Sequence, residues 1–204
     1  MSKTYLEKVY SVKNTEEARQ IYDEWAGSYD DELLEQGYAT PMRVARALAA
    51  QIQNMDKPVL DFGCGTGLSG AALIQNGFTV IDGTDLSAEM LAQAADKGVY
   101  RDLWQTHPGA ELPFDSGKYT AITASGVIGS GAGPSELLEI LMEGLAPRGL
   151  LAFSFNDHTL TDPNYMAPLR DWTTDGIASL LFEEHGPHIP GIDLGSTVYV
   201  FEKA

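Results

Sequence analysis

The chain of 204 residues is 44% hydrophobic, which is enough apolar side chain to bury the core of one globular domain. Its 29 acidic residues outnumber its 13 Lys and Arg, and the net charge of −16 disfavours docking on nucleic acid or anionic lipid. Cys64 is the one cysteine, so no intrachain disulfide can form. Neither a signal-peptide core nor a run approaching the ~18 apolar residues of a membrane span is present. We therefore expect a cytoplasmic protein of one domain, residues 1–204, with no nucleic-acid or membrane partner.

The first expected elements are helices that precede any strand. Residues 15–25 begin with a capping pattern and place apolar and aromatic residues at helical spacing. The string Y-D-x-W-A-x-x-Y-D covers residues 22–30. A further helix starts with Thr40 as its N-cap and Pro41 as its first residue.

Strands and helices then alternate to the end of the chain. We expect strands at 59–60, 78–85, 99–103, 119–124, 150–155, 177–184 and 196–202. Helical stretches follow residue 67, Ser87, Pro134 and Asp162. This order predicts an α/β, Rossmann-like, doubly wound sheet of seven strands that is mostly parallel, with an antiparallel C-terminal edge hairpin.

The glycine-rich stretch V-L-D-F-G-C-G-T-G at residues 59–67 is the centre of this pattern. A strand, a glycine-rich turn and a helix form the layout of a nucleotide-type cofactor site, and glycines let a ligand approach the backbone. The spacing G-x-G-x-G differs from the dinucleotide fingerprint G-x-G-x-x-G. Asp61, two residues before Gly63, would repel a pyrophosphate but suits a ligand that carries a positive charge.

Asp85 is the second residue on which the functional prediction depends. It ends the second expected strand, where an acid in such folds accepts hydrogen bonds from ribose hydroxyls. The alternative is that Asp85 caps the helix after Leu86, although Ser87 already suits that role.

Taken together, these segments resemble the class I S-adenosylmethionine (SAM) methyltransferases, nearest to the small Williams–Beuren-region type and more loosely to the ubiquinone/menaquinone methyltransferases. The resemblance extends over about residues 20–156. The segments that carry it lie in order at residues 22–30, 59–67, 83–91, 112–114, 126–131 and 145–149.

The resemblance implies S-adenosyl-L-methionine as the cofactor and no metal. The cofactor-binding residues that it implies are Tyr22, Tyr29, Asp61, Gly63, Cys64, Gly65, Asp85, Leu86, Met90, Ser125 and Gly126. In that assignment the glycine turn holds the methionine part, with Asp61 near its amine. Asp85 binds the ribose, Leu86 and Met90 contact adenine, and Ser125 and Gly126 border the sulfonium. Many relatives also place an acid after strand three, but residues 104–108 contain none.

The resemblance further implies N-terminal lid helices in residues 1–40 and a core sheet in residues 41–204. Tyr22 and Tyr29 would belong to the lid, although plain helix-core packing is the alternative for both. His185 and His188 form a poor metal pair, because glycine and proline separate them and no cysteine or third histidine is near.

The predicted activity is methyl transfer from SAM to a small-molecule acceptor. For catalysis the candidates are His158, as a general base after strand five, and Tyr29; for His158 a surface-loop position is the alternative. Two other functions stay open: a non-catalytic SAM-binding protein, and a nicotinamide-dependent oxidoreductase, which Asp61 and the glycine spacing disfavour. The acceptor and the oligomeric state are not predicted.

Overall fold

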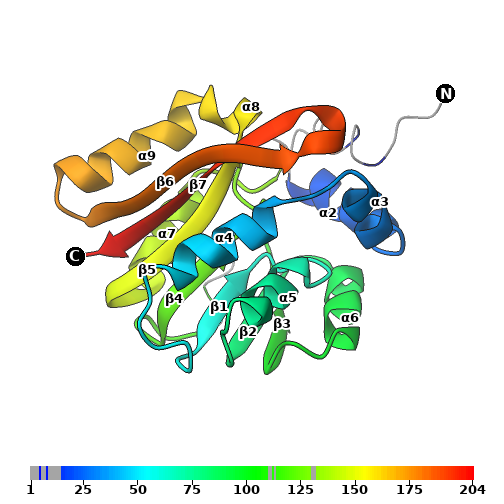
Figure 1. Ribbon diagram of the computed structural model, residues 1–204, viewed down its shortest axis with the longest axis horizontal. Helices are drawn as coiled ribbons and strands as arrows, with labels where there is room; N and C mark the ends of the chain where they lie inside the picture. The colour runs from blue at the N-terminus through cyan, green and yellow to red at the C-terminus, as the bar shows by residue number, and fades with distance from the viewer. Residues whose placement is uncertain (1–4, 6–7, 9–14, 110–111, 113, 130–131) are drawn as a thin grey trace.

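The computed structural model describes residues 5, 8, 15–109, 112, 114–129 and 132–204 (Figure 1). The expected lid is therefore described from residue 15 onward, together with residues 5 and 8. Of the segments at 112–114 and 126–131, residues 113, 130 and 131 lie outside the described residues.

One sheet organises the described part of the chain. Its seven strands lie in the order β3-β2-β1-β4-β5-β7-β6. The strands are β1 (Val59–Phe62), β2 (Ile81–Asp85), β3 (Asp102–Gln105), β4 (Tyr119–Ala124), β5 (Leu145–Asn156), β6 (Ala178–Ile189) and β7 (Leu194–Lys203). Strands β1 to β5 pair in parallel, and β7 runs antiparallel to both β5 and β6. The predicted fold class is confirmed.

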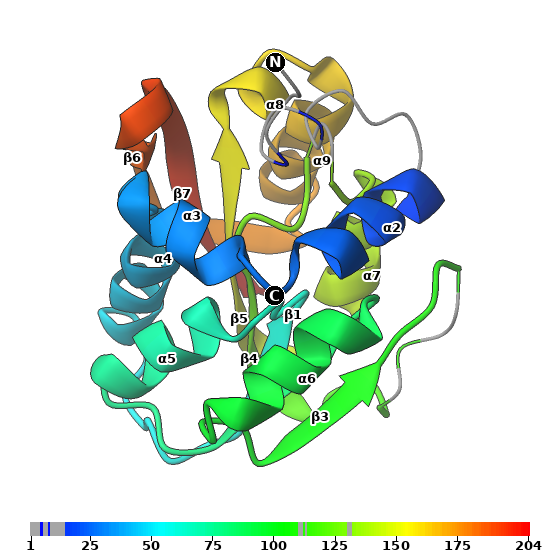
Figure 2. The same cartoon turned by 90° about the vertical axis from the view of Figure 1, so that its right-hand side faces the viewer.

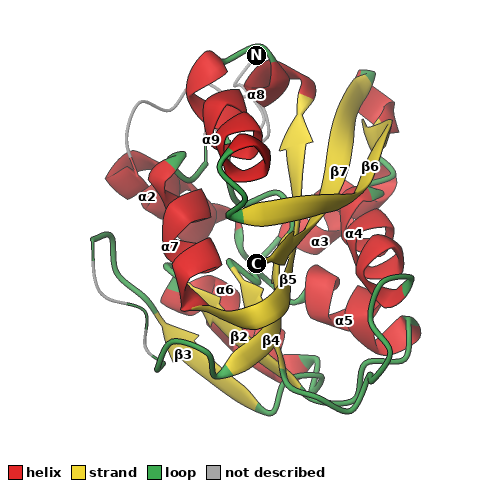
Figure 3. Cartoon of the chain, turned by 90° about the vertical axis from the view of Figure 1, so that its left-hand side faces the viewer, coloured by secondary structure: helices red, strands yellow, loops and turns green. Residues whose placement is uncertain are grey.

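Helices cover both faces of the sheet. They are α2 (Thr15–Trp25), α3 (Tyr29–Glu35), α4 (Thr40–Ala49), α5 (Leu68–Gln75), α6 (Ala88–Asp96), α7 (Glu136–Gly144), α8 (Asp157–Leu160) and α9 (Pro163–Thr174), with a short 3-10 helix, η1 (Pro190–Ile192). Figure 3 shows α4 and α5 on one side of the sheet and α7 and α9 on the other. Figure 2 shows α2 and α3 lying across the end of the sheet, above α5 and α6.

The core divides into one apolar cluster on each face, as strand alternation requires. Val59 packs with residues of α4 and α5, whereas the next residue, Leu60, packs with residues of α7 and α9. Both side chains are fully buried. Burial on both faces explains why this parallel strand begins as an unbroken apolar pair.

Tertiary contacts explain where the end of β6 and the start of α4 differ from the prediction. β6 reaches Ile189, so His185 and His188 lie in a strand paired with β7 and not in a loop. Thr40 is the first residue of α4 and not its N-cap, which is Ala39. Its hydroxyl is buried and hydrogen-bonds His188 Nδ1 at 2.7 Å and Ser196 Oγ at 3.1 Å. These tertiary partners take the hydroxyl away from helix capping.

In the part of the chain that the structure describes, none of the helices combines the length and the apolar character needed to cross a membrane.

Candidate cofactor site

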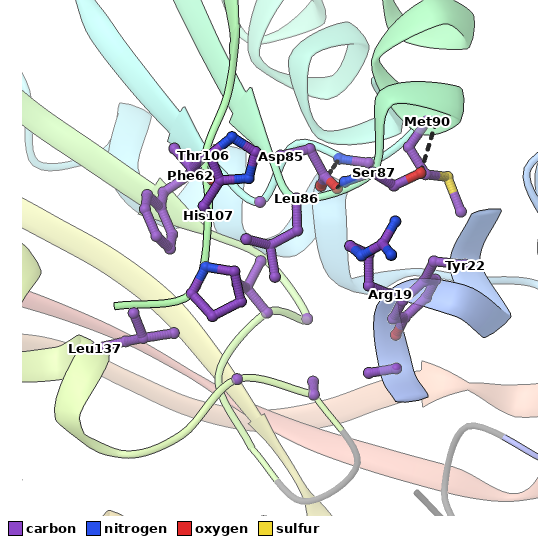
Figure 4. A pocket seen from close by; sticks show the side chains of 18 of the residues that line it. Arg19, Tyr22, Phe62, Asp85, Leu86, Ser87, Met90, Thr106, His107 and Leu137 are labelled. Carbon is purple, nitrogen blue, oxygen red and sulfur yellow. Dashed lines mark hydrogen bonds between the residues drawn. The ribbon is translucent and has the colours of Figure 1, made fainter. Parts of the chain in front are cut away.

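A cavity of about 280 Å³ opens at the edge of the sheet where β1, β2 and β4 end (Figure 4). β1 lies between β2 and β4, so this is the point at which the strand order reverses, the usual ligand position in such sheets. The predicted cofactor residues that line the cavity are Tyr22, Tyr29, Gly63, Gly65, Asp85, Leu86, Met90, Ser125 and Gly126. Four segments far apart in sequence, at residues 22–29, 63–65, 85–90 and 125–126, thus meet at one cavity.

The glycine turn after β1 has the backbone shape that its sequence predicts. Gly63 and Gly65 have φ values of +68° and +55°, which side chains disfavour. A Cβ on Gly63 would lie 2.5 Å from Val127 Cγ2, so this glycine is also required for packing against the loop after β4. A Cβ on Gly65 would meet no atom within 4 Å, which leaves open space at that point of the turn.

Asp85 connects the glycine turn to the start of α6. Its Oδ2 accepts a hydrogen bond from the Gly65 amide at 2.8 Å, and its Oδ1 accepts one from the Ser87 amide at 2.9 Å. Burial raises the pKa of the carboxyl, and these two amides oppose the shift. Ser87 itself is the N-cap of α6 and accepts from the Met90 amide. Asp85 therefore takes part in the turn at the helix start and also lines the cavity.

Asp61, which the resemblance places near the cofactor amine, lies beneath the glycine turn in the structure. Asp61 is fully buried and is not among the lining residues. It accepts hydrogen bonds from Ser69 Oγ at 2.5 Å, Tyr100 OH at 2.8 Å and Thr123 Oγ1 at 3.0 Å. Burial raises the pKa of Asp61 to about 6, and the hydroxyl donors limit the rise. Asp61 thus holds β1, α5 and β4 together beneath the turn.

Two further predicted residues lie away from the cavity. Cys64 is buried under the turn, and desolvation raises the pKa of its thiol well above the usual value. Its amide donates to the Thr84 carbonyl at 2.8 Å, so its backbone serves the turn. His158 lies exposed on α8 and is not among the lining residues. The cavity is therefore not where His158 would act as a base.

Several lining residues escaped the sequence analysis. Thr106, His107 and Pro108 reach the cavity from the segment after β3, in which an acid was sought and not found. Arg19 projects from α2 opposite Asp85 (Figure 4). The sequence could have predicted this position, because Arg19 precedes Tyr22 by three residues and residues three apart lie on the same face of a helix.

The cavity fits the adenosyl and amino-acid parts of SAM. Asp85 provides a carboxylate, Gly65 leaves open space, and Ser125 provides a buried hydroxyl. Among the described residues that hydroxyl has no hydrogen-bond partner, so a ligand can supply one. The remaining wall is mostly apolar, as small-molecule sites are. The apolar lining includes Phe62, Leu86, Met90, Leu112, Val127 and Leu137.

Strand order, glycine turn and terminal acid together define a class I SAM-dependent methyltransferase. Residues 34–196 match the family described as "Methyltransferase domain", and the chain belongs to that family. The predicted cofactor, S-adenosyl-L-methionine, is confirmed by membership of this family. The nicotinamide alternative is wrong.

Curated relatives match over parts of the chain. Methyltransferase-like protein 27 of Homo sapiens is 33% identical over 117 residues, which are 56% of this chain and 48% of that protein. The 18S rRNA (guanine(1575)-N(7))-methyltransferase of Saccharomyces cerevisiae is 41% identical over 63 residues, 31% of this chain and 23% of that protein. The 18S rRNA (guanine-N(7))-methyltransferase of Bos taurus is 41% identical over 78 residues, 37% and 27% of the two chains. The chain thus matches about half the length of these relatives or less.

Solved structures share the fold over most of the chain. A chain in the complex between the Haloferax volcanii Trm112 methyltransferase activator and a methyltransferase superposes with a TM-score of 0.69 at 18% identity, covering 91% of this chain and 97% of that one. A TehB-like SAM-dependent methyltransferase from Corynebacterium glutamicum gives a TM-score of 0.62 at 19% identity, covering 90% and 98%. At these identities the likeness establishes the fold alone.

The relatives correct one prediction drawn from charge. The excess of acid led us to exclude nucleic acid as a partner, but two of the matched relatives are named as rRNA methyltransferases. Net charge describes the average field of a protein, whereas a nucleic-acid contact needs only a local patch. The exclusion is therefore withdrawn.

Proposed function

We propose that this domain transfers the methyl group of S-adenosyl-L-methionine to a small-molecule acceptor. The observation that supports the proposal is the meeting of the glycine turn, Asp85 and Ser125 around one cavity that α2 and α3 close. SAM, when bound, supplies a methyl group already activated for transfer. The protein therefore has to bind the reacting groups, orient them and exclude water from them.

Each wall of the cavity has a role in this proposal. Asp85 accepts hydrogen bonds from the ribose hydroxyls, and Leu86 with Met90 forms the apolar wall beside adenine. The Ser125 hydroxyl and the Gly126 backbone border the reacting end. Tyr22 and Tyr29, from α2 and α3, cover the cavity and exclude water.

Guanine in ribosomal RNA is a second candidate acceptor. The observation that favours it is the 41% identity to two 18S rRNA guanine-N7 methyltransferases. These matches cover 31% and 37% of this chain, so each spans only a part of the domain. The cytoplasmic location stays a prediction.

The test is a transfer assay with methyl-labelled SAM and two acceptor panels. One panel contains metabolites grouped by acceptor atom, and the other contains small-subunit rRNA. We expect label on a metabolite and release of S-adenosylhomocysteine, with both lost in Asp85→Asn. Label on N7 of guanine in the rRNA panel alone would replace the first candidate with the second. Binding of S-adenosylhomocysteine without transfer to either panel would favour the non-catalytic alternative.

A further inference from the structure

The hydroxyl of Tyr38 lies beside a glycine that borders the cavity. Tyr38 belongs to the segment between α3 and α4, and the glycine is Gly126, which follows β4. A Cβ on Gly126 would lie 2.6 Å from the Tyr38 hydroxyl oxygen and 3.8 Å from its Cζ, so the phenol occupies the place of a side chain. Gly126 also has a φ of +73°, which side chains disfavour. The backbone shape and the neighbouring phenol both require glycine here.

Packing holds the ring of Tyr38 in place. It meets the ring of His188 edge to face, with the centroids 5.3 Å apart and the planes at 89°. The amide of the next residue, Ala39, donates to the His188 carbonyl at 2.9 Å. The Tyr38 ring also packs against the buried cluster of Trp25, Leu33, Ile189 and Leu194. The phenol is therefore a fixed part of the structure at the end of β6.

His188, which contacts this phenol, is itself fixed. It is buried at the end of β6, and its Nδ1 lies 2.7 Å from the hydroxyl of Thr40 on α4. Burial lowers the pKa of His188 to about 4, so its ring stays neutral around pH 7. Contacts thus run without a break from α4 and β6 through His188 and Tyr38 to Gly126.

A second contact holds Gly126 from the neighbouring strand. Its amide donates to the hydroxyl of Ser154, a buried residue of β5, at 3.1 Å. Gly126 is therefore held by β5 through its amide and meets Tyr38 on the Cα side. Ser125 and Gly126 line the cavity, and in the proposed function they border the transferred methyl group. Because transfer rates are sensitive to small displacements, whatever fixes this segment affects the reaction.

We propose that Tyr38 is a positioning residue for methyl transfer: it fixes the Ser125–Gly126 segment by filling the space beside Gly126. The inference rests on the proposed function, because it takes this segment as the border of the reacting group. Tyr38 is not among the described residues that line the cavity, so it acts through Gly126. The connection between α3 and α4 thereby contributes to the geometry of the reacting end.

The first test measures binding at the two ends of the cofactor separately. Calorimetry with the whole chain would compare SAM, S-adenosylhomocysteine and adenosine. The first two ligands differ by the methyl group, and adenosine lacks the reacting end. Tyr38→Phe removes the hydroxyl and keeps the ring that meets His188. We expect it to change the ratio of the SAM and S-adenosylhomocysteine affinities by roughly 3- to 10-fold, the range for residues in contact, and to leave the adenosine affinity unchanged.

The second test asks whether Tyr38 acts through Gly126. Gly126→Ala adds a methyl group for which the hydroxyl leaves no space, and Tyr38→Phe removes that hydroxyl. The loss of S-adenosylhomocysteine affinity caused by Gly126→Ala should therefore be roughly 3- to 30-fold smaller in the Tyr38→Phe background. The positive φ of residue 126 accounts for the loss that remains.

Leu34→Ala is the matched control, because Leu34 lies on α3 with 61% of its surface exposed and does not line the cavity. It should leave the affinity ratio unchanged, and thermal unfolding of every variant checks the fold. An unchanged ratio in Tyr38→Phe, equal losses for all three ligands, or an effect of Gly126→Ala that does not depend on residue 38 would each overturn the inference and leave the proposed function standing. An unmodified protein that binds none of the three ligands would overturn the proposed function, and the inference with it.

Discussion

The Gly65 amide and the Asp85 carboxylate are joined by a hydrogen bond of 2.8 Å between residues twenty positions apart in sequence. The turn after β1 and the acid at the end of β2 therefore form one unit before any ligand binds. Because Asp85 Oδ1 also accepts from the Ser87 amide, the start of α6 belongs to the same unit. A rigid cofactor turn follows from this arrangement, since three backbone segments share one carboxylate.

Replacing Asp85 should reduce the affinity for the cofactor more than it reduces the stability of the fold. We expect Asp85→Ala to reduce the affinity for S-adenosylhomocysteine by roughly 10- to 100-fold, because hydrogen bonds to a charged group are each worth about 1.5–3 kcal/mol and water recovers part. Calorimetry measures the affinity, and circular dichroism checks that the variant is folded. Glu89→Gln, an exposed acid in the first turn of α6, is the control. Unchanged affinity in folded Asp85→Ala would leave Asp85 with its structural role alone.

Two glycines of the turn should respond differently to the same small change. Both have positive φ, so alanine strains either position, but a Cβ at Gly63 would also meet Val127 at 2.5 Å. We therefore expect Gly63→Ala to lower the unfolding midpoint further than Gly65→Ala. Gly65→Val, whose side chain points into open space, should instead block ligand binding. Equal midpoints for the two alanine variants would contradict the contact with Val127.

The buried carboxyl of Asp61 should make stability depend on pH. Its pKa is raised by burial to about 6 from the usual value of 3.8, so between these pH values the folded state holds a proton that the unfolded state releases. Asp61 consequently contributes stability that is full below pH ~4 and is lost as the pH rises through ~6. The difference in unfolding free energy between the unmodified protein and Asp61→Asn should thus fall from pH 4 to pH 7, by up to about 3 kcal/mol. Denaturant unfolding at several pH values measures it, and a difference that does not change with pH would contradict this prediction.

Local sequence signals were sufficient for the elements that depend on neighbouring residues. β4 (Tyr119–Ala124) has the predicted bounds, and α5 (Leu68–Gln75) begins directly after residue 67 as predicted. An apolar run between turn signals and a glycine turn before a helix are both local features. Nine of the eleven predicted cofactor-binding residues line the cavity, because the glycine turn and the acid at the end of β2 form a recognisable pattern.

What the sequence did not reveal depends on partners far along the chain. Asp61 lies beneath the turn because hydroxyls 8, 39 and 62 residues away reach it, and no spacing rule predicts such partners. His188 belongs to β6 because β7 pairs with the residues on either side of it, Pro187 and Ile189. Arg19 is part of the cavity wall only because α2 crosses the end of the sheet. In each case tertiary packing supplied the deciding contact.

The N-terminal lid stays a prediction, and the structure suggests how its two described helices should differ. α3 is tied to the cofactor turn through Asp30, which accepts hydrogen bonds from the Thr66 hydroxyl and from Lys97 Nζ, the latter at 2.6 Å. Lys97 Nζ also donates to the Thr66 carbonyl at 2.6 Å. α2 does not include Asp30, and it places Arg19 and Tyr22 at the wall of the cavity. We therefore expect α2 to be the part whose order depends on the ligand.

Hydrogen exchange of residues 15–36, with and without S-adenosylhomocysteine, tests this expectation. Exchange in α2 should slow by roughly tenfold or more when the ligand binds. Local unfolding of the helix must then break its contacts with the ligand in addition to the helix's own hydrogen bonds. Exchange in α3 should change less, and Lys97→Met should make α3 behave like α2 by removing the cation that holds Asp30. Trp25 is buried at the end of α2, so ligand-independent protection limited to its last turn is consistent with the lid. Equal protection of all of α2 in both states would end the lid hypothesis and assign Tyr22 and its neighbours to packing alone.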